Sequence, residues 1–258
     1  MTRTLVLVAA LMAMLTATPA SAERIVSSLT THQVFVTSNF VGLDLVLFGS
    51  VERDPADPPR NGPYDLVVTV TGPKESLVTR RKQRVLGVWV NVESRDFIGV
   101  PSYLAVMSTR PFDAFAGQDL RRGLQLGLER TVLTQRIGAD FADVVRDDPF
   151  RKAFLRLKEQ RKLYVENTSG VTFLTPTLFR TTLPLPATVP IGTYDVDLKL
   201  FADGKLVGRS SSAFEVAKVG FEQFVVTSAQ SHGIWYGLAT LSFALLTGWG
   251  ASIVFRRD

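Results

Sequence analysis

A run of 22 residues without a charged side chain, from Ile234 to Phe255, constrains this chain more than any other feature. As a helix rising 1.5 Å per residue it would be about 33 Å long, enough to cross the hydrocarbon core of a bilayer. Trp235 and Tyr236, which favour the headgroup level, stand at its start, and Arg256 and Arg257 follow it on the side expected to be cytoplasmic. A buried core helix would show a polar stripe, which is absent here. We therefore expect a transmembrane helix over residues 234–255 and a cytoplasmic tail over 256–258.

The second apolar segment lies at the N-terminus. Met1-Thr2-Arg3 is a short basic start, residues 4–18 are mainly apolar, and Ala20-Ser21-Ala22 offers small residues for signal peptidase. Residues 1–22 are therefore predicted to be a signal peptide cleaved after Ala22. An uncleaved anchor is the alternative, but its apolar core of about 15 residues is short for a span of about 30 Å. Both ends together predict a single-pass protein of the inner membrane with most of its chain in the periplasm.

Composition limits the chemistry of the residues between these ends. The chain has no cysteine and only two histidines, His32 and His232. Disulfides, thiolate nucleophiles and cysteine-based metal sites are thereby excluded. We expect no catalytic residues, no metal and no cofactor, and hence no enzyme. The net charge of +5 suits an anionic bilayer surface better than a nucleic acid, which a secreted domain rarely meets, so we expect no nucleic-acid partner.

Short strand-like segments fill residues 23–116 and 164–230. In the first part, alternating and β-branched segments are separated by Gly-Pro and Asp-Pro turns. In the second part, Pro190-Ile191-Gly192-Thr193-Tyr194 leads into an alternating strand, and Asp203-Gly204 is a favoured hairpin turn. The pattern predicts a mainly β fold, an antiparallel sandwich of the immunoglobulin-like kind. We favour one interrupted domain, and two β modules remain the alternative. The strands predicted in the first part include 43–51, 64–71, 77–81 and 85–92.

The apolar pattern changes to a helical period over residues 117–163. Asp148 is expected to cap a second helix that has Pro149 at its first position and runs to about Leu163. We therefore predict a helical-hairpin insert. The first helix is inferred from Leu120, Leu124, Leu128, Leu133, Ile137 and Phe141, and the apolar stripe of the second from Phe150, Ala153, Phe154 and Leu157.

Two basic clusters are the candidate interaction sites. Arg80, Arg81, Lys82 and Arg84 lie close to Trp89, which we expect in the core rather than on the surface. The functional interpretation is contact with anionic lipid or an acidic partner; the alternative is an ordinary solvated face. Asp195 and Asp197, two apart on one strand, are best explained as its polar outer face. The second cluster decorates the second insert helix and comprises Arg151, Lys152, Arg156, Lys158, Arg161 and Lys162.

Several stretches, in this order along the chain, form a recognisable set: Gly72-Pro73, Arg80-Arg81-Lys82, Gly87-Val88-Trp89-Val90-Asn91, Val100-Pro101-Ser102-Tyr103, residues 173–179, Gly220-Phe221-Glu222-Gln223-Phe224, and the final span with Phe255-Arg256-Arg257. They resemble an alphaproteobacterial family of transmembrane proteins without an assigned activity, and the likeness runs from about Ile25 to the C-terminus. The resemblance implies an inner-membrane protein with a periplasmic β-rich domain and no transferable catalytic residues. It also suggests a companion of a sulfite-exporter-type permease.

Two functional hypotheses follow. The first is an accessory or scaffold protein that is anchored in the inner membrane and docks on a membrane protein, with a permease as the suspected partner. The second is a periplasmic module that binds or senses a small anion through Arg80 to Arg84 and Trp89.

Overall fold

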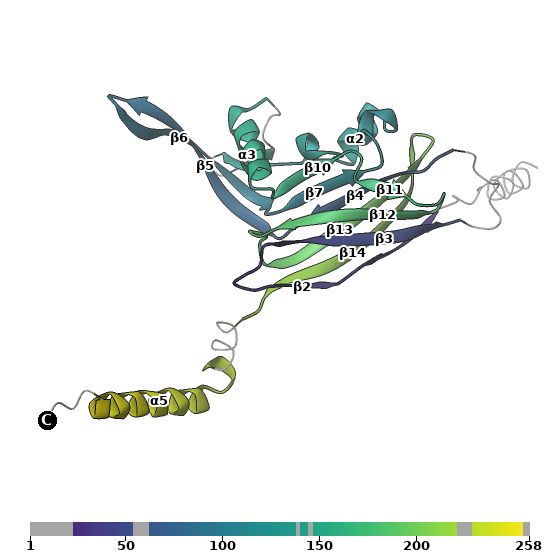
Figure 1. The fold of residues 1–258 in the computed structure, drawn as a ribbon. Coiled ribbons are helices and arrows are strands. Elements are labelled where there is room, and N and C mark those ends of the chain that lie inside the picture. The colour runs from purple at the N-terminus through teal and green to yellow at the C-terminus, as the bar shows by residue number, and fades with distance from the viewer. Residues whose placement is uncertain (1–22, 54–61, 138–139, 144–146, 221–228, 255–258) are drawn as a thin grey trace, which may run out of the picture.

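The computed structural model describes residues 23–53, 62–137, 140–143, 147–220 and 229–254. In these residues the fold is mainly β, as predicted, and its strands form three sheets (Figure 1). The predicted signal peptide lies outside the described residues, as do Phe255, Arg256, Arg257 and the rest of the C-terminal tail.

The first sheet has four antiparallel strands in the order β1-β3-β12-β11. Because β3 pairs with β12 over nine residue positions, from Gly42–Pro186 to Ser50–Leu178, segments more than 120 residues apart become neighbours. The strands are β1 Arg24–Leu29, β3 Gly42–Glu52, β11 Val171–Phe173 and β12 Leu178–Pro186.

The second sheet has six strands in the order β10-β7-β4-β13-β14-β2. Its inner pairs are antiparallel, but β10 pairs with β7, and β2 with β14, in parallel, so the expected purely antiparallel sandwich is wrong at these two edges. The strands are β2 Gln33–Val36, β4 Asp65–Thr71, β7 Leu104–Ser108, β10 Tyr164–Asn167, β13 Gly192–Ala202 and β14 Lys205–Lys218.

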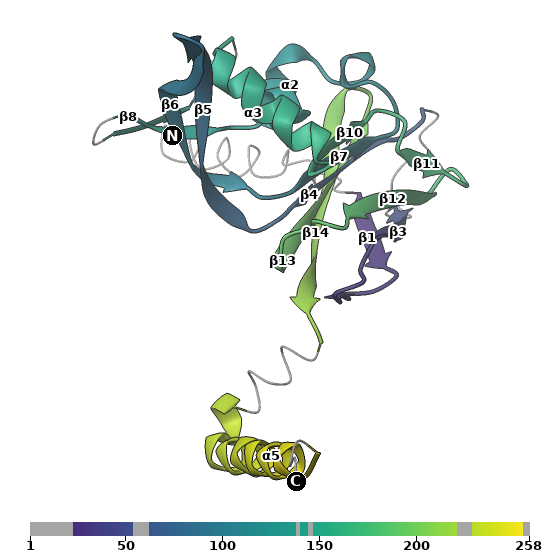
Figure 2. The ribbon, with the colours of Figure 1, turned by 60° about the vertical axis from the view of Figure 1, so that its left-hand side comes forward.

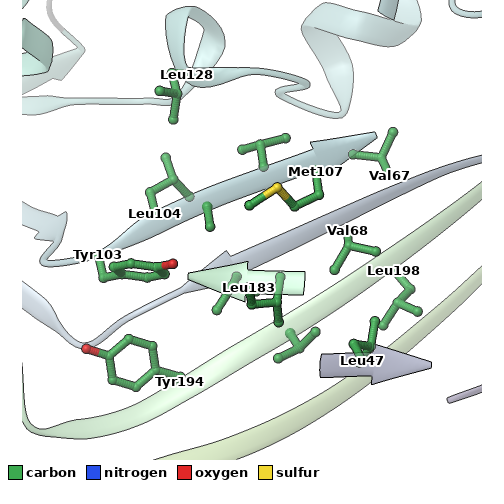
Figure 3. Packing of buried hydrophobic residues seen from close by; sticks show 14 of the residues in the cluster. Leu47, Val67, Val68, Tyr103, Leu104, Met107, Leu128, Leu183, Tyr194 and Leu198 are labelled. Carbon is green, nitrogen blue, oxygen red and sulfur yellow. The ribbon is translucent and has the colours of Figure 1, made fainter. Parts of the chain in front are cut away.

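The core lies between these two sheets, because alternate residues of each strand point to the same side. Leu47 and Leu183 come from the first sheet and Val68 and Leu198 from the second, and all four are fully buried (Figure 3). On the other side of the second sheet, Leu128 covers the region near Leu104 and Val67. Both predicted β segments, 23–116 and 164–230, contribute strands to the first and to the second sheet, so they form one packed unit.

Strands β1, β3, β12 and β11 of the first sheet face β14, β13, β4 and β7 of the second. At the start of β13, the Tyr194 hydroxyl donates a hydrogen bond to the Pro190 carbonyl at 2.6 Å. Burial is the main cause that raises the pKa of Tyr194, so its hydroxyl stays a donor.

The third sheet, β5-β6-β8-β9, contains a long hairpin that extends away from the core (Figure 1). Only the base of this hairpin is buried, where Phe97 of β6 packs on Phe154 with ring centroids 4.7 Å apart. The strands are β5 Lys74–Val85, β6 Val88–Pro101, β8 Thr134–Ile137 and β9 Asp140–Asp143.

The prediction of a helix in the first half of the insert is wrong. Among the residues of this half that the structure describes, only α2, Gln118–Gly123, is α-helical, and a 3-10 turn, Leu128–Arg130, and strands β8 and β9 follow it. Another 3-10 turn, Phe112–Ala114, lies just before the predicted insert. Helix α2 ends at Gly123, and the positive φ angles of Gln125 (+51°) and Gly127 (+94°) prevent it from continuing, so the leucine spacing does not reflect a continuous helical face. Leu126, Leu128 and Leu133 are instead buried individually in the core.

The second insert helix is present as α3, Pro149–Gln160, and it begins as predicted. The Asp148 carboxylate accepts hydrogen bonds from the backbone N–H groups of Phe150 and Arg151. The buried face of α3 is rotated from the expected stripe: Phe150, Arg151, Phe154 and Lys158 are buried, whereas Leu157 is exposed.

The C-terminal helix α5 covers Gly233–Val254 and lies apart from the sheets in both views (Figures 1 and 2). Within the described part of the chain, however, no helix meets both the length and the hydropathy needed to cross a bilayer.

Candidate functional site

The hairpin of β5 and β6 carries the first basic cluster. The two strands are joined by Leu86 and Gly87, whose φ angles of +48° and +88° suit a tight two-residue hairpin turn. The prediction placed two strands at residues 77–81 and 85–92, with a connection between them at residues 82–84. In the structure β5 continues to Val85, and the turn lies after it.

The two faces of this hairpin differ in chemistry. Arg84 stands opposite Trp89 and Lys82 opposite Asn91, so Arg80, Lys82, Arg84 and Trp89 share one face. On the other face near the turn, Val85 lies opposite Val88, and Gln83 lies opposite Val90. One face is therefore cationic with an indole ring, and near the turn the other carries three valines beside Gln83.

The hairpin tip is exposed. Leu86 is 100% exposed and Trp89 66%, so the expectation that Trp89 lies in the core is wrong. The ring alternates with valines as a core residue would, but β5 and β6 have left the body of the protein at this point, so no core reaches it (Figure 1). The structure does bring Trp89 next to Arg84 of the basic cluster.

The basic cluster of α3 divides into two groups. Arg151 and Lys158 are buried and serve the fold: Arg151 donates to the carbonyls of Glu129 and Thr131, and Lys158 to the Glu75 carboxylate and the Ser102 carbonyl. The prediction of one solvated basic face is wrong for these two residues. The residues that remain exposed are Lys152, Arg156, Arg161 and Lys162.

A groove of about 270 Å³ brings the two clusters together. Thr79, Arg80, Arg81 and Lys82 of β5 form one wall, and the exposed side of α3 forms the other. The Arg81 guanidinium also contacts Glu93 at 3.0 Å, an ion pair in which both side chains are about half exposed. The α3 wall consists of Pro149, Phe150, Ala153, Arg156 and Leu157.

Of the acidic pair, Asp195 is exposed, whereas Asp197 takes part in the structure. The Asp197 carboxylate accepts hydrogen bonds from Lys199 and from Arg209, whose Nε is 2.7 Å away. Burial alone would raise the pKa of Asp197, but these hydrogen bonds outweigh it and hold the pKa below its ordinary value. The carboxylate is thus an ionised partner of two cations. Among the residues described, no cluster of three or more histidine, cysteine or acidic side chains could hold a metal ion.

The predicted membrane-interface anchors lie on and after α5. Trp235 is 72% exposed and Tyr236 half-buried at the first turn of the helix, while Arg256 and Arg257 lie outside the described residues. From Ile234 to Trp249, α5 exposes a continuous set of large apolar side chains.

One family model matches residues 24–257, nearly the entire chain, and describes the family as "Putative transmembrane protein (Alph_Pro_TM)". The chain belongs to this family. The resemblance inferred from the sequence is thereby confirmed. The stretch Gly87-Val88-Trp89-Val90-Asn91, one of those that carried the resemblance to the Alph_Pro_TM family, forms the exposed hairpin tip.

Other comparisons add little to Alph_Pro_TM membership. No curated protein matches the chain. Among solved structures, the chain is similar to the N-terminal domain of the Streptococcus gordonii adhesin Sgo0707, with 10% identity and a TM-score of 0.26. The match covers 75% of this chain and 32% of the adhesin chain, so this chain spans about a third of that structure. A likeness at this TM-score carries no argument about function.

Sequence reasoning found the β5 part of the site but missed the α3 wall of the groove. Phe150, Ala153 and Leu157 were assigned to a core-facing stripe, because their spacing fits one. The signal against that assignment is the pair Arg151 and Lys158, which occupy the truly buried face. Arginine and lysine on one side of a helix are weak evidence for a buried face, since these residues usually lie on the solvent side.

Proposed function

We propose that this member of the Alph_Pro_TM family is an accessory protein of the bacterial inner membrane. Its β body lies on the periplasmic side and docks on an integral membrane protein. A permease of the sulfite-exporter type is the partner class that the family resemblance suggests.

The exposed tip of the β5–β6 hairpin is the observation that carries this proposal. A soluble protein gains by burying tryptophan and leucine, yet here Leu86, Val88 and Trp89 are all more than half exposed at the end of a projecting element. Burying such a side chain against a partner contributes about 1.5–3 kcal/mol. Tryptophan and arginine are also the residues most often found at the energetic centre of protein interfaces.

Attachment to the membrane through the C-terminal segment is part of the same proposal. Helix α5 has 22 residues, and no charged residue occurs between Gly233 and Val254. Its large apolar side chains are exposed, and so extensive an apolar surface on a soluble protein marks a contact with lipid or protein. Together with the predicted signal peptide, the arginine pair after the helix favours a periplasmic body and a cytoplasmic C-terminus.

We also propose that the two main sheets form an immunoglobulin-like unit. Their strand order and the hydrogen bond from Tyr194 to Pro190 support this class. The class serves many functions, so it does not narrow the present one.

A module that binds a small anion is the second candidate. The groove between β5 and α3 favours it, because the side chains of Arg80, Arg81, Lys82 and Arg156 line one cavity. Calorimetric titration of the protein with sulfite and sulfate tests this candidate. It predicts a heat of binding for the native protein and none when Arg80 and Arg156 are replaced.

Affinity purification from gently solubilised membranes tests docking. We expect one membrane protein to be recovered in stoichiometric amount with the tagged chain. The double replacement Leu86→Ser and Trp89→Ser should lower this recovery by about tenfold, since it removes the apolar contacts of the tip. Recovery of the native chain alone at every detergent strength would refute the docking proposal.

A matched control comes from another exposed apolar residue. Val41 is 89% exposed and lies before β3, in a different part of the body. Val41→Ser removes a similar exposed apolar group without touching the hairpin, so partner recovery should remain at the native level. Equal losses in both variants would mean that surface hydrophobicity in general, and not the hairpin, determines recovery.

A further inference from the structure

The groove between β5 and α3 runs along the edge of a strand. Four consecutive β5 residues, from Thr79 to Lys82, line it, and no β6 residue does. Consecutive strand residues point to opposite faces of a sheet, so a cavity touched by all four must lie at the strand's open side. Helix α3 forms the facing wall, beside the base of the hairpin in both views (Figures 1 and 2).

This side of β5 is free for pairing in the part of the chain that the structure describes. The sheet order is β5-β6-β8-β9, so β5 is an edge strand. Both irregularities in its pairing with β6 place the extra residue on β6: Glu75 and Leu77 face Val100 and Phe97, and Arg81 and Lys82 face Glu93 and Asn91. Strand β5 therefore stays regular, whereas natural edge strands are commonly protected from pairing by bulges.

The walls of the groove combine positive charge with apolar surface. Leu157 is 45% exposed, Ala153 is half-buried and Phe150 is buried, so α3 offers an apolar wall with Arg156 on it. The nearby acids have partners: Asp148 caps α3 and contacts Arg95 at 3.4 Å, and Asp147 contacts Lys152 at 3.0 Å. The net charge at the groove is therefore positive.

We propose that this groove binds an extended acidic segment of the docked membrane protein, which adds as a strand to the free edge of β5. The inference rests on the proposed function and specifies the chemistry of the partner. Strand addition in a groove between an edge strand and a helix takes affinity from main-chain hydrogen bonds and specificity from alternate side chains.

The two faces of β5 define the sequence of that segment. Arg80 and Lys82 lie on one face, while Thr79 and Arg81 lie on the other, the face on which α3 packs through Phe154 and Phe97. Side chains of an added strand alternate in the same way. Carboxylates therefore project toward Arg80 and Lys82, and apolar side chains in between project toward Leu157 and Ala153. The segment alternates acidic and apolar residues over about four positions, the length of the lining strand.

Selection from a displayed library of random peptides of about eight residues tests this proposal on the full chain in lipid nanodiscs. The expected result is enrichment of alternating acidic and apolar sequences. The enriched peptide, followed by fluorescence anisotropy, should bind about tenfold more weakly to Arg80→Glu and to Arg156→Glu. The matched control at the end of the same helix is Arg161→Glu, which reverses an exposed charge that does not line the groove and should leave affinity unchanged.

The backbone contribution is tested on the peptide itself. Two versions of the peptide are made, each N-methylated at every second amide, one at the odd positions and one at the even positions. In one version the methyl groups replace the N–H donors that face β5, and this version should not bind. In the other they replace the donors that face away, and this version should bind as the unmodified peptide does; equal effects would overturn strand addition. The proposal would also be overturned if the enriched peptides lacked acidic residues, or if the Arg156→Glu variant selected the same peptides. Complete displacement of the peptide by millimolar sulfate would overturn it as well, because that result would assign the groove to a small anion.

The groove inference and the docking proposal can be refuted independently of each other. The variant with Leu86→Ser and Trp89→Ser should lose the membrane partner yet still bind the selected peptide, because neither residue lines the groove. Intact partner recovery with Arg156→Glu would refute the groove inference alone.

Discussion

At the scale of single residues, Lys158 is a cation built into the core. It is 6% exposed, donates to the Glu75 carboxylate and to the Ser102 carbonyl at 3.0 Å, and lies 5.8 Å and 5.5 Å from the ring centres of Phe154 and Tyr164. The side chain thus links α3 to the base of β5. Its charge is satisfied by hydrogen bonds and aromatic faces rather than by water.

We expect Lys158→Ala to lower the free energy of unfolding by about 3 kcal/mol, because it leaves the Glu75 carboxylate without its cation and opens a cavity between two rings. Lys152 on the same helix is exposed and should change the same quantity by less than about 0.5 kcal/mol when replaced by alanine. Thermal unfolding of both variants measures this contrast. Equal effects would show that Lys158 contributes no more than a surface lysine.

At the scale of elements, the turn of the β5–β6 hairpin combines an unfavourable residue with a favourable one. Leu86 has a φ of +48°, a conformation that costs a leucine about 1 kcal/mol, whereas Gly87 adopts +88° without strain. Asparagine before glycine is the preferred pair for such turns. The native leucine therefore places an exposed apolar side chain at the turn but lowers the stability of the hairpin.

Leu86→Asn should stabilise the hairpin by about 1 kcal/mol, because asparagine tolerates this conformation. Slower amide hydrogen exchange at Val85 and Val88 measures the gain. Gly87→Val should have the opposite effect for conformational reasons alone, since no atom lies within 4 Å of a Cβ added there. Faster exchange in Leu86→Asn would contradict this account of the turn.

Sequence patterns predicted elements whose signals are local. Strands β3 and β4, the Asp203-Gly204 turn between β13 and β14, and the cap of α3 at Asp148 were all predicted, because periodicity, turn chemistry and capping act over a few residues. The turn at Leu86 was missed because leucine is no turn signal. The groove could not be predicted, since it joins residues about 70 positions apart through tertiary packing.

At the scale of the whole molecule, α5 and the β body have different solvent requirements. The body buries its apolar side chains between sheets, whereas α5 exposes Ile234, Leu241, Phe243 and Trp249. Surface of this kind is stable in lipid or against protein but promotes aggregation in water. The two parts therefore favour different locations, with residues 219–232 between them.

We expect the full chain to sediment with membranes and to resist extraction by alkaline carbonate. A chain ending at residue 220 lacks α5 but keeps every strand of the three sheets, so it should appear in the soluble envelope fraction with an unchanged melting temperature of the body. Immunoblotting of the fractions measures this. Membrane association of the shortened chain at high salt would place the attachment elsewhere in the protein.

The pairing of β3 with β12 and of β4 with β13 also determines when this protein can mature. During synthesis β3 and β4 emerge more than 120 residues before their partners β12 and β13, and the second sheet is complete only after residue 218 has been made. The pairs that can form earlier, β1 with β3 and β4 with β7, therefore keep their inner apolar faces uncovered until late in elongation. Products of premature termination should be degraded rather than accumulate as folded fragments.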